Sequence, residues 1–458
     1  MKELMKGFGI LITFFAALIL SACGGESSLP VATGKANIRA INGVKTAPDV
    51  GFLIEERALG TVGYRQITSN SIYDDLTYNF NFDVLYAGEP ELVRVASILV
   101  DIIKDLDYVF VLTGTLAEPS ILVWETVDRE FTGTETIFEA RFAHTAASLG
   151  NVDYYFAAVG VDPLVGEKAG TLSFGGVLPS IDYEAGEYVL TITAEGMPGQ
   201  VLYESAPTNF NAASQLIISS FDGDANTFAP VVARAFASSF DSVGGSIVMP
   251  DTNYPPTAEF VNGSLAIGTV DIYEDALLSS QIVAGHAYKD VSDELEVSPE
   301  AYPVLYTPTT LLSPVLIDDE ITFFGGIRGR VVAYGESDDL QIKSYAPDRQ
   351  SIESQAKLQL FNSATNFDFV SVFIEDADTP IEDILILLPR AVIPSGSLEA
   401  TIGLAEGSFD IYLSNVARDI VFAGPIRIDV EYGDVLGGMI FETNDPNVLE
   451  LEFLPNNP

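Results

Sequence analysis

Cysteine, histidine and basic side chains are scarce in this chain of 458 residues. One cysteine excludes internal disulfides, and one cysteine with two histidines argues against a zinc or iron–sulfur site. A nucleophilic triad could draw only on His144 and His286, and the sequence has no glycine-flanked serine elbow, phosphate loop or dinucleotide fingerprint. Lys and Arg number 22 against 65 acidic residues, a formal charge of −43, which excludes nucleic acid and anionic lipid head groups as partners.

Long apolar runs are also missing, apart from one at the N-terminus. It extends from Gly7 to Leu20, follows Lys2 and Lys6, and ends in Leu20-Ser-Ala-Cys23. A bilayer-spanning helix needs about 20 residues, so this run is too short to span and predicts an exported, cleaved segment. The only cysteine of the chain stands at its end, where a thiol could serve lipid attachment.

This N-terminus resembles a bacterial lipoprotein signal with its lipobox. The resemblance implies a signal peptide over residues 1–22, lipid attachment at Cys23, and a tether over residues 23–34. Gly24 stands where the family places aspartate for inner-membrane retention, so the resemblance implies the outer membrane. The expected location is the cell envelope, with the membrane contacted through the lipid.

The rest of the chain repeats one pattern four times, at intervals of roughly 100 residues. Alternating apolar and polar residues lead to a polar anchor, and eight residues after each anchor a valine opens an apolar or aromatic run. The anchors are Asn42, His144, Asn262 and Asn362, and the valines are Val50, Val152, Val270 and Val370. An aromatic later opens a mid-module strand, and an acidic or proline-bearing turn separates the last two strands.

Many short strands without a convincing amphipathic helix predict an all-β chain of four tandem immunoglobulin-like β-sandwich modules. The predicted modules span residues 35–126, 137–238, 256–346 and 355–455. The linkers between them are about 10 to 19 residues long, which favours a rod of modules that pivot and fold independently.

The alternation slips by one position at each anchor. The slip leaves an apolar residue where a polar one is due, at Ile41, Ala143, Val261 and Phe361. Such a slip predicts a β-bulge, or a strand that crosses between sheets. The anchor side chain is then expected to bond loop backbone groups, which is a structural role.

The module openings resemble the bacterial domain-of-unknown-function family 4397. Arg141-Phe-Ala-His144 with Val152-Asp-Tyr-Tyr155 is the best match, followed by Arg39-Ala-Ile-Asn42 and Val270-Asp-Ile-Tyr273, while the fourth module has Ser371 in place of the aspartate. The resemblance implies secreted or lipid-anchored β-sandwich repeats and no assigned activity.

One loop has the oxygen spacing of a weak calcium-site candidate, formed by Asp222, Asp224 and Asn226. It lacks a glycine at the sixth position, and Ala233 stands where a bidentate acid would close the site. An ordinary acidic hairpin tip is the simpler interpretation, and no cofactor is otherwise expected.

The leading hypothesis is a non-enzymatic, lipid-anchored envelope protein that serves as a spacer or as an adhesion or binding array, with an envelope protein or glycan as partner. Tandem modules multiply a weak contact through effective concentration. The alternative is a calcium-dependent glycan-binding protein or an envelope hydrolase of the glycosidase type, with its site in one divergent module; paired carboxylates would suffice for such chemistry.

Overall fold

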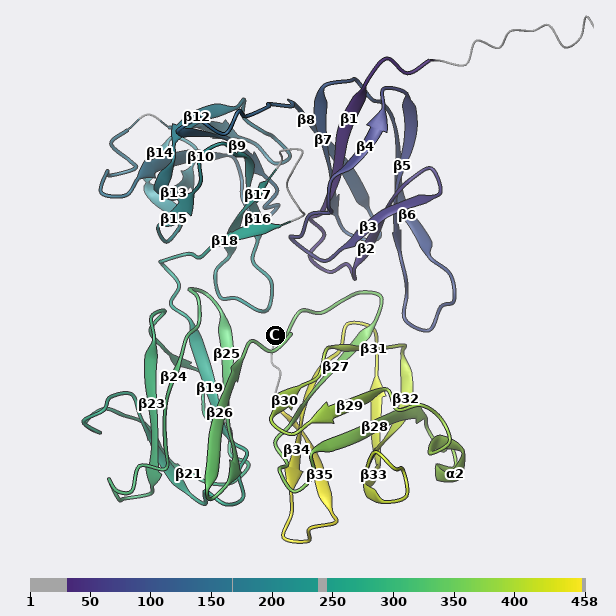
Figure 1. Cartoon of the computed structure of the whole chain (residues 1–458), viewed down its shortest axis with the longest axis vertical. Helices are drawn as coiled ribbons and strands as arrows, with labels where there is room; N and C mark the ends of the chain where they lie inside the picture. Colours follow the sequence, from purple (N-terminus) through teal and green to yellow (C-terminus); the bar gives the residue numbers. More distant parts are fainter. Residues whose placement is uncertain (1–30, 167, 238–244, 455–458) are drawn as a thin grey trace, which may run out of the picture.

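The computed structural model describes residues 31–166, 168–237 and 245–454 of the chain. It confirms an all-β fold built of several β-sandwich modules. The four modules lie two by two, with modules 2 and 1 above modules 3 and 4 in the view of Figure 1. The first half of the chain therefore forms one layer of the molecule and the second half the other.

The first two modules contain eight and ten strands in the described residues. In module 1 these are β1 (Lys35–Asn42), β2 (Val50–Ile54), β3 (Arg57–Val62), β4 (Ser71–Asp74), β5 (Thr77–Val84), β6 (Val93–Asp101), β7 (Leu106–Gly114) and β8 (Pro119–Val127). In module 2 they are β9 (Ile137–His144), β10 (Val152–Ala158), β11 (Gly170–Leu172), β12 (Ile181–Glu184), β13 (Gly186–Ala194), β14 (Met197–Glu204), β15 (Thr208–Phe210), β16 (Gln215–Asp222), β17 (Val231–Ala237) and β18 (Ser246–Met249).

The last two modules are built alike, with one short helix added. Module 3 contains β19 (Thr257–Asn262), β20 (Val270–Tyr273), β21 (Gln281–His286), β22 (Leu295–Glu296), β23 (Tyr302–Pro308), β24 (Ile317–Ile321), β25 (Arg328–Glu336) and β26 (Asp339–Tyr345). Module 4 contains β27 (Ala356–Asn362), β28 (Phe369–Asp376), α2 (Ile381–Ile384), β29 (Ala391–Pro394), β30 (Ser397–Leu398), β31 (Ile402–Leu404), β32 (Gly407–Ser414), β33 (Val421–Val430), β34 (Val435–Glu442) and β35 (Leu449–Leu454).

Each module has two sheets of related strand order. One sheet, here called the inner sheet, contains the first strand of the module; in module 1 its order is β4-β1-β7-β8. The other, the outer sheet, has the order β3-β2-β5-β6. In every module the first strand runs parallel to a late strand of the inner sheet, in the pairs β1–β7, β9–β16, β19–β25 and β27–β34.

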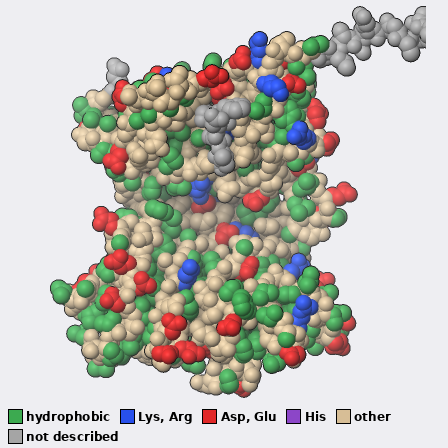
Figure 2. Space-filling view, in the orientation of Figure 1, with side chains coloured by type: hydrophobic (Ala, Val, Ile, Leu, Met, Phe, Trp, Pro, Cys, Tyr) green, Lys and Arg blue, Asp and Glu red, His purple; other side chains and the backbone are tan. Residues whose placement is uncertain are grey.

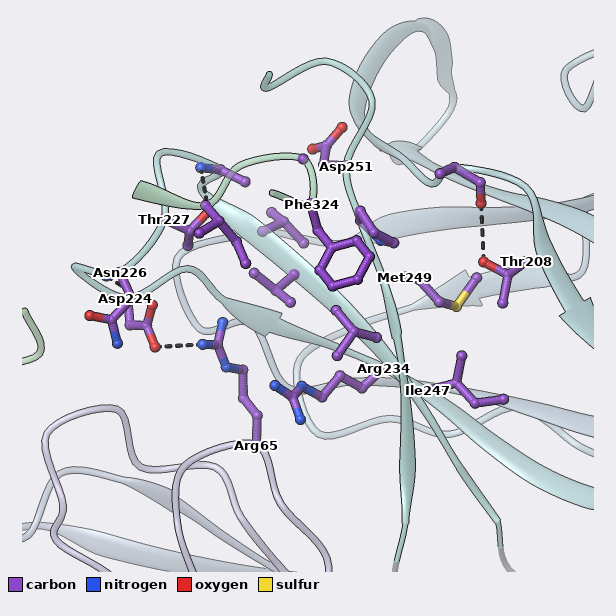
Figure 3. A pocket seen from close by; sticks show the side chains of 18 of the residues that line it. Arg65, Thr208, Asp224, Asn226, Thr227, Arg234, Ile247, Met249, Asp251 and Phe324 are labelled. Atoms are coloured by element: carbon purple, nitrogen blue, oxygen red, sulfur yellow. Dashed lines mark hydrogen bonds and ion pairs between the residues drawn. The ribbon is translucent and has the colours of Figure 1, made fainter. Parts of the chain in front are cut away.

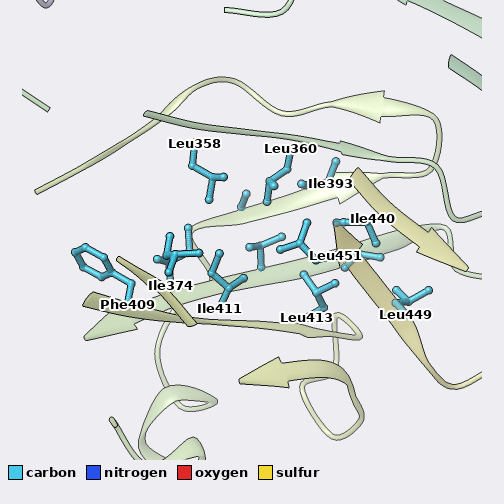
Figure 4. Packing of buried hydrophobic residues seen from close by; sticks show 14 of the residues in the cluster. Leu358, Leu360, Ile374, Ile393, Phe409, Ile411, Leu413, Ile440, Leu449 and Leu451 are labelled. Atoms are coloured by element: carbon cyan, nitrogen blue, oxygen red, sulfur yellow. The ribbon is translucent and has the colours of Figure 1, made fainter. Parts of the chain in front are cut away.

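The two sheets of a module enclose its own hydrophobic core. Figure 4 shows this core in module 4, where Leu358, Leu360 and Ile440 of the inner sheet meet Ile374 and Ile411 of the outer sheet. Full burial of one such side chain is worth about 1.5–3 kcal/mol. The period-two pattern of the sequence corresponds to these inward-pointing residues.

The modules also pack against each other in pairs, through the outward faces of their inner sheets. A cluster of Ile41, Val109 and Trp124 from module 1 with Ile217 and Phe221 from module 2 joins the first pair. A second cluster joins modules 3 and 4: Val261, Val332, Phe361, Met439, Phe441 and Leu454. Each pair is thus a stack of four sheets with a third apolar layer at its centre, so the prediction of freely pivoting modules is wrong.

This packing explains the apolar slip at the anchors. No register shift interrupts the first strand of any module, and each of these strands belongs to one sheet only, so the predicted bulge and the predicted crossing between sheets are both wrong. Ile41, Ala143, Val261 and Phe361 belong to the clusters between paired modules. These strands are buried on both faces near their ends, one face in the core of the module and the other against the partner module.

Charged side chains on the same outward faces are buried as well. The Arg39 guanidinium donates to the carbonyl of Ala237 in module 2. Reciprocally, Arg141 of module 2 donates from Nη1 to the carbonyl of Glu125 in module 1 at 2.8 Å. The alternation predicts a solvated face for these arginines, and the structure places them inside the pair, where backbone carbonyls receive their N–H groups.

The two pairs repeat one docking contact. Tyr64 of module 1 donates its hydroxyl to the carbonyl of Asp222 in module 2 at 2.8 Å, and Tyr288 of module 3 donates to that of Glu442 in module 4 at 2.8 Å. The residue after each tyrosine, Arg65 or Lys289, has a positive φ and forms an ion pair with the partner module. Odd modules supply the tyrosine and even modules the acidic strand end, so the structural repeat is a pair of modules.

A strand lies within the predicted linker between modules 2 and 3. β18 pairs with β17 and extends the inner sheet of module 2. Only residues from Pro250 to Pro256 then remain between this sheet and β19. The path between the two pairs is correspondingly short.

Asp107, at the interface of modules 1 and 2, is expected to make the free energy of unfolding depend on pH. Asn37 donates to its Oδ1 at 2.6 Å, while its Oδ2 is buried and has no hydrogen-bond donor in the part of the chain that the structure describes. Burial raises the pKa of Asp107 to about 7. Because its pKa is lower in the unfolded chain, ionisation opposes folding, and its cost grows as the pH rises from about 4 to about 7.

Asp107→Asn is therefore expected to raise the free energy of unfolding by at least about 1 kcal/mol at pH 8, where one pKa unit corresponds to about 1.4 kcal/mol. Near pH 4 the gain should vanish because the wild-type carboxyl is protonated. Urea unfolding at both pH values measures the difference, and Asp338→Asn at an exposed hairpin tip is the matched control. An equal gain at pH 4 and pH 8 would contradict the prediction.

Candidate binding site between the modules

The four anchors close the loop after their strand. Each is fully buried at the end of the first strand of its module. In the three asparagines, Oδ1 accepts the N–H two residues on, and Nδ2 donates to a carbonyl on an edge strand of the outer sheet. The two partners are Val44 and Val62 for Asn42, Ser264 and His286 for Asn262, and Ala364 and Ile393 for Asn362. Each asparagine thereby ties the inner sheet to the outer sheet.

His144 holds the same position with different chemistry. One ring nitrogen, Nε2, lies 3.1 Å from the carbonyl of Gly150, and Nδ1 lies 3.1 Å from Oγ of Ser220. Tyr154 also bonds this serine, at 2.7 Å. His144, Ser220 and Tyr154 have no exposed surface, so the serine–histidine contact is closed to a substrate. Ser220 gives the second ring nitrogen the partner that a buried imidazole requires.

The three oxygen donors of the calcium-site candidate point to different partners. Asp222 accepts N–H groups of Ala147 and Ser148 at 3.0 Å, as Glu442 does for the equivalent loop of module 4. Asp224 pairs with Arg65, and Oδ1 of Asn226 accepts the N–H of Arg349 at 2.6 Å. Asp222 thus bonds a loop of its own module, Asp224 connects the hairpin to module 1, and Asn226 connects it to the segment before module 4.

A cavity of about 720 Å³ lies beside this hairpin, between the two layers of modules. We call it the central cavity. Its lining comes from module 2, from the segment Phe324–Ile327 of module 3, and from Arg65 of module 1. Figure 2 shows the molecule hollowed between the upper and lower modules. Its volume is in the range of small-molecule sites, which form preferentially at domain interfaces.

Two arginines lie at one end of the central cavity, as Figure 3 shows. Arg65 pairs through Nη2 with Oδ2 of Asp224 at 2.5 Å, but its Nε and Nη1 are buried and have no hydrogen-bond partner among the described residues. Arg234, on β17, donates from Nη1 to Oγ of Ser246 at 3.1 Å, and within the same described ranges its Nε is buried without an acceptor. Burial and the adjacent positive charge of Arg65 lower the pKa of Arg234 to about 10.

The remaining wall of the cavity is largely apolar. Ile247, Val248 and Met249 line it from β18, and Phe324 lines it from module 3. Phe324 is 62% exposed, an unusual state for a large aromatic side chain. A polar group recurs at the far end, where Asp251 is buried and no donor from residues 31–166, 168–237 or 245–454 bonds its Oδ2. Burial raises the pKa of this carboxyl.

Sequence reasoning singled out only Asp224 and Asn226 of this lining, as part of a calcium-site candidate, and missed the cavity itself because its residues come from three modules. Arg65, Arg234 and Phe324 are distant in the sequence and share no motif. One signal was available in Val231-Val-Ala-Arg-Ala-Phe-Ala237, a strand that places a rare arginine among apolar residues. Arg65 has a φ of 60°, which is unusual for a residue other than glycine. This signal of a functional position is visible in the structure but not in the sequence.

Cys23 lies outside the described residues, as does the signal peptide. In the described ranges, no helix combines the length and apolar composition needed to cross a membrane.

Comparisons with known proteins identify no family for this chain. No family model matches the sequence, and no curated protein matches it. Among solved structures, the TIE protein of Bacillus anthracis is similar over 90% of this chain and 69% of its own length, at 9% identity and a TM-score of 0.16. The product complex of the multi-modular glycogen-degrading pneumococcal virulence factor SpuA is similar over 84% of this chain and 37% of its own, at 10% identity and a TM-score of 0.15.

Proposed function

We propose that this chain is a non-enzymatic, lipid-anchored binding protein of the bacterial cell envelope, and that its ligand occupies the central cavity. The observation that carries the proposal is a cavity of about 720 Å³ lined by three modules. An apolar cluster joins modules 1 and 2, and module 3 contacts module 2 through a β-bridge between Thr227 and Ile327. A flexible spacer would not need modules fastened side by side. The module pairs instead hold cavity residues in fixed positions, which limits the entropy lost on binding.

The anchoring part of the proposal rests on the N-terminal sequence. Lys2, Lys6, the apolar run and Cys23 have the order of a lipoprotein signal, which would tether the modules through residues 23–34. Cys23→Ser should abolish incorporation of labelled palmitate and release the protein from washed envelopes. Labelled protein or envelope retention in this variant would contradict lipid anchoring at Cys23.

The binding part is tested by native mass spectrometry of the protein after incubation with envelope extract. We expect the wild type to retain a small molecule. Val248→Trp, which places a large side chain in the cavity wall, should lose it, because Val248 lines the cavity and is 44% exposed. Val392→Trp on β29 is the matched control, since Val392 is 41% exposed and lies in module 4.

Two results would overturn cavity binding. One is a wild-type protein that retains nothing from the extract. The other is equal retention by Val248→Trp and the wild type, which would place the ligand elsewhere.

A further inference from the structure

The charges at the arginine end of the central cavity do not balance, and Asp251, the other acidic residue of the lining, lies at the far end. Arg65 and Arg234 are close enough for the charge of one to depress the pKa of the other, while Asp224 is the carboxylate that acts on Arg234. Asp224 is already committed, through Oδ2, to Nη2 of Arg65. Two guanidinium groups thus share one carboxylate, in a chain whose acids outnumber its bases 65 to 22. A surplus positive charge held partly out of water in so acidic a chain needs an explanation.

The unpartnered N–H groups lie on the same two side chains. Nε and Nη1 of Arg65 and Nε of Arg234 have no acceptor in the described residues. Burial of a charged donor without an acceptor is costly, and few such groups persist in folded proteins without a functional reason. A guanidinium presents its donors in a planar fork that matches the two oxygens of a carboxylate.

The rest of the cavity favours an apolar body. Ile247, Val248 and Met249 of β18 line it together with Phe324 of module 3. The one surplus positive charge of the two arginines is matched by a ligand with one negative charge. A phosphate monoester would bring up to about two negative charges. An apolar body with a single carboxylate therefore suits both the wall and the charged end.

We propose that the central cavity takes an apolar molecule bearing one carboxylate, which the guanidinium groups of Arg65 and Arg234 hold while Phe324 and β18 cover its apolar part. The proposal rests on the binding function proposed above and adds the class of ligand. Because the lining comes from modules 1, 2 and 3, the bound molecule would also link the first module pair to the second.

Three probes with one alkyl chain and different head groups test this: decanoate, 1-decanol and decylammonium. Isothermal titration calorimetry below the micellar concentration uses the chain from Gly24 onward, which contains every described residue. We expect decanoate to bind at least about tenfold more tightly than decanol, since a bond to a charged group is worth about one such factor. Decylammonium should bind most weakly, because its charge repeats that of the arginines.

Arg234→Gln should bring decanoate to the affinity of decanol while leaving decanol unchanged, and Arg234→Lys should recover part of the difference. Arg57→Gln makes the same charge change at an exposed side chain outside the cavity and should bind like the wild type. If Arg234→Gln does not fold, the order of the three probes on the wild type still decides.

Equal affinities, tightest binding of decylammonium, or no binding of any probe would overturn the carboxylate proposal. If one of these results occurs while the wild type retains a molecule from the extract and Val248→Trp does not, only the proposed ligand class is wrong. If the wild type also retains nothing from the extract, the proposed binding function is wrong as well.

Discussion

Replacement of Glu259 by glutamine is expected to lower the free energy of unfolding by about 3–5 kcal/mol, because it leaves buried positive charges without their carboxylate. Oε2 of Glu259 accepts from Nη2 of Arg330 at 2.6 Å and from Nη2 of Arg349 at 3.0 Å. All three side chains are buried between modules 3 and 4. Without the carboxylate, two positive charges would remain in this interface with no opposite charge between them.

Denaturant unfolding followed by circular dichroism measures this loss. Glu56→Gln is the matched control, because Glu56 also pairs with an arginine, Arg94, but its side chain is 85% exposed. Exposed pairs contribute about 0–1 kcal/mol, so the control should remain close to the wild type. If both variants lose equally little, the Glu259 cluster does not stabilise the pair of modules.

Replacing the whole cluster separates the cost of an unpaired charge from the value of the ion pairs. Glu259→Met combined with Arg330→Met and Arg349→Met leaves no buried charge behind. Exchanges of this kind are often neutral in stability. The triple variant should therefore be more stable than Glu259→Gln alone.

The strands and sandwiches of this fold were predictable from local pattern. Val50, Val152 and Val270 open the second strand of their modules, and in module 4 the strand starts one residue earlier, at Phe369. Alternation and turn residues act over a few positions, so one sequence contains the information. The order of strands within a sheet depends on contacts between distant segments and could not be derived in this way.

The pairing of modules was hidden by an ambiguity of the same pattern. An apolar residue in a polar phase indicates a shifted register or a second buried face, and a single sequence does not distinguish them. At Ile41 and Phe361 the second face is the correct explanation. Arg39 and Arg141 add to the ambiguity, because arginine is normally exposed and here reaches carbonyls of the partner module.

The central cavity was beyond prediction for a related reason. Arg65 comes close to Arg234 where Tyr64 docks on the end of β16. Phe324 joins the same cavity where the module 2 hairpin pairs with module 3 at Thr227 and Ile327. Neither contact leaves a periodic trace in the sequence. A site between modules becomes visible only once the modules have been assembled.

A fragment of residues 251–454, which holds modules 3 and 4, is expected to unfold in one cooperative transition, whereas residues 355–454 alone should be far less stable. Isolation of module 4 exposes Phe361, Met439 and Phe441, which are fully buried in the pair. Each such side chain contributes about 1.5–3 kcal/mol by burial. Their joint loss is comparable to the whole stability of a small domain, about 5–15 kcal/mol.

Scanning calorimetry of the two fragments, with a dye that fluoresces on exposed apolar surface, measures the difference. Phe441→Ala in the two-module fragment should lower stability by about 3–5 kcal/mol, as for other buried phenylalanines. The same substitution in the isolated module should cost much less, because Phe441 is exposed there before the change. If the isolated module is as stable as the pair, each module folds by itself and the interface only joins folded modules. If the isolated module binds the dye and melts at a low temperature, the pair of modules is the unit that folds.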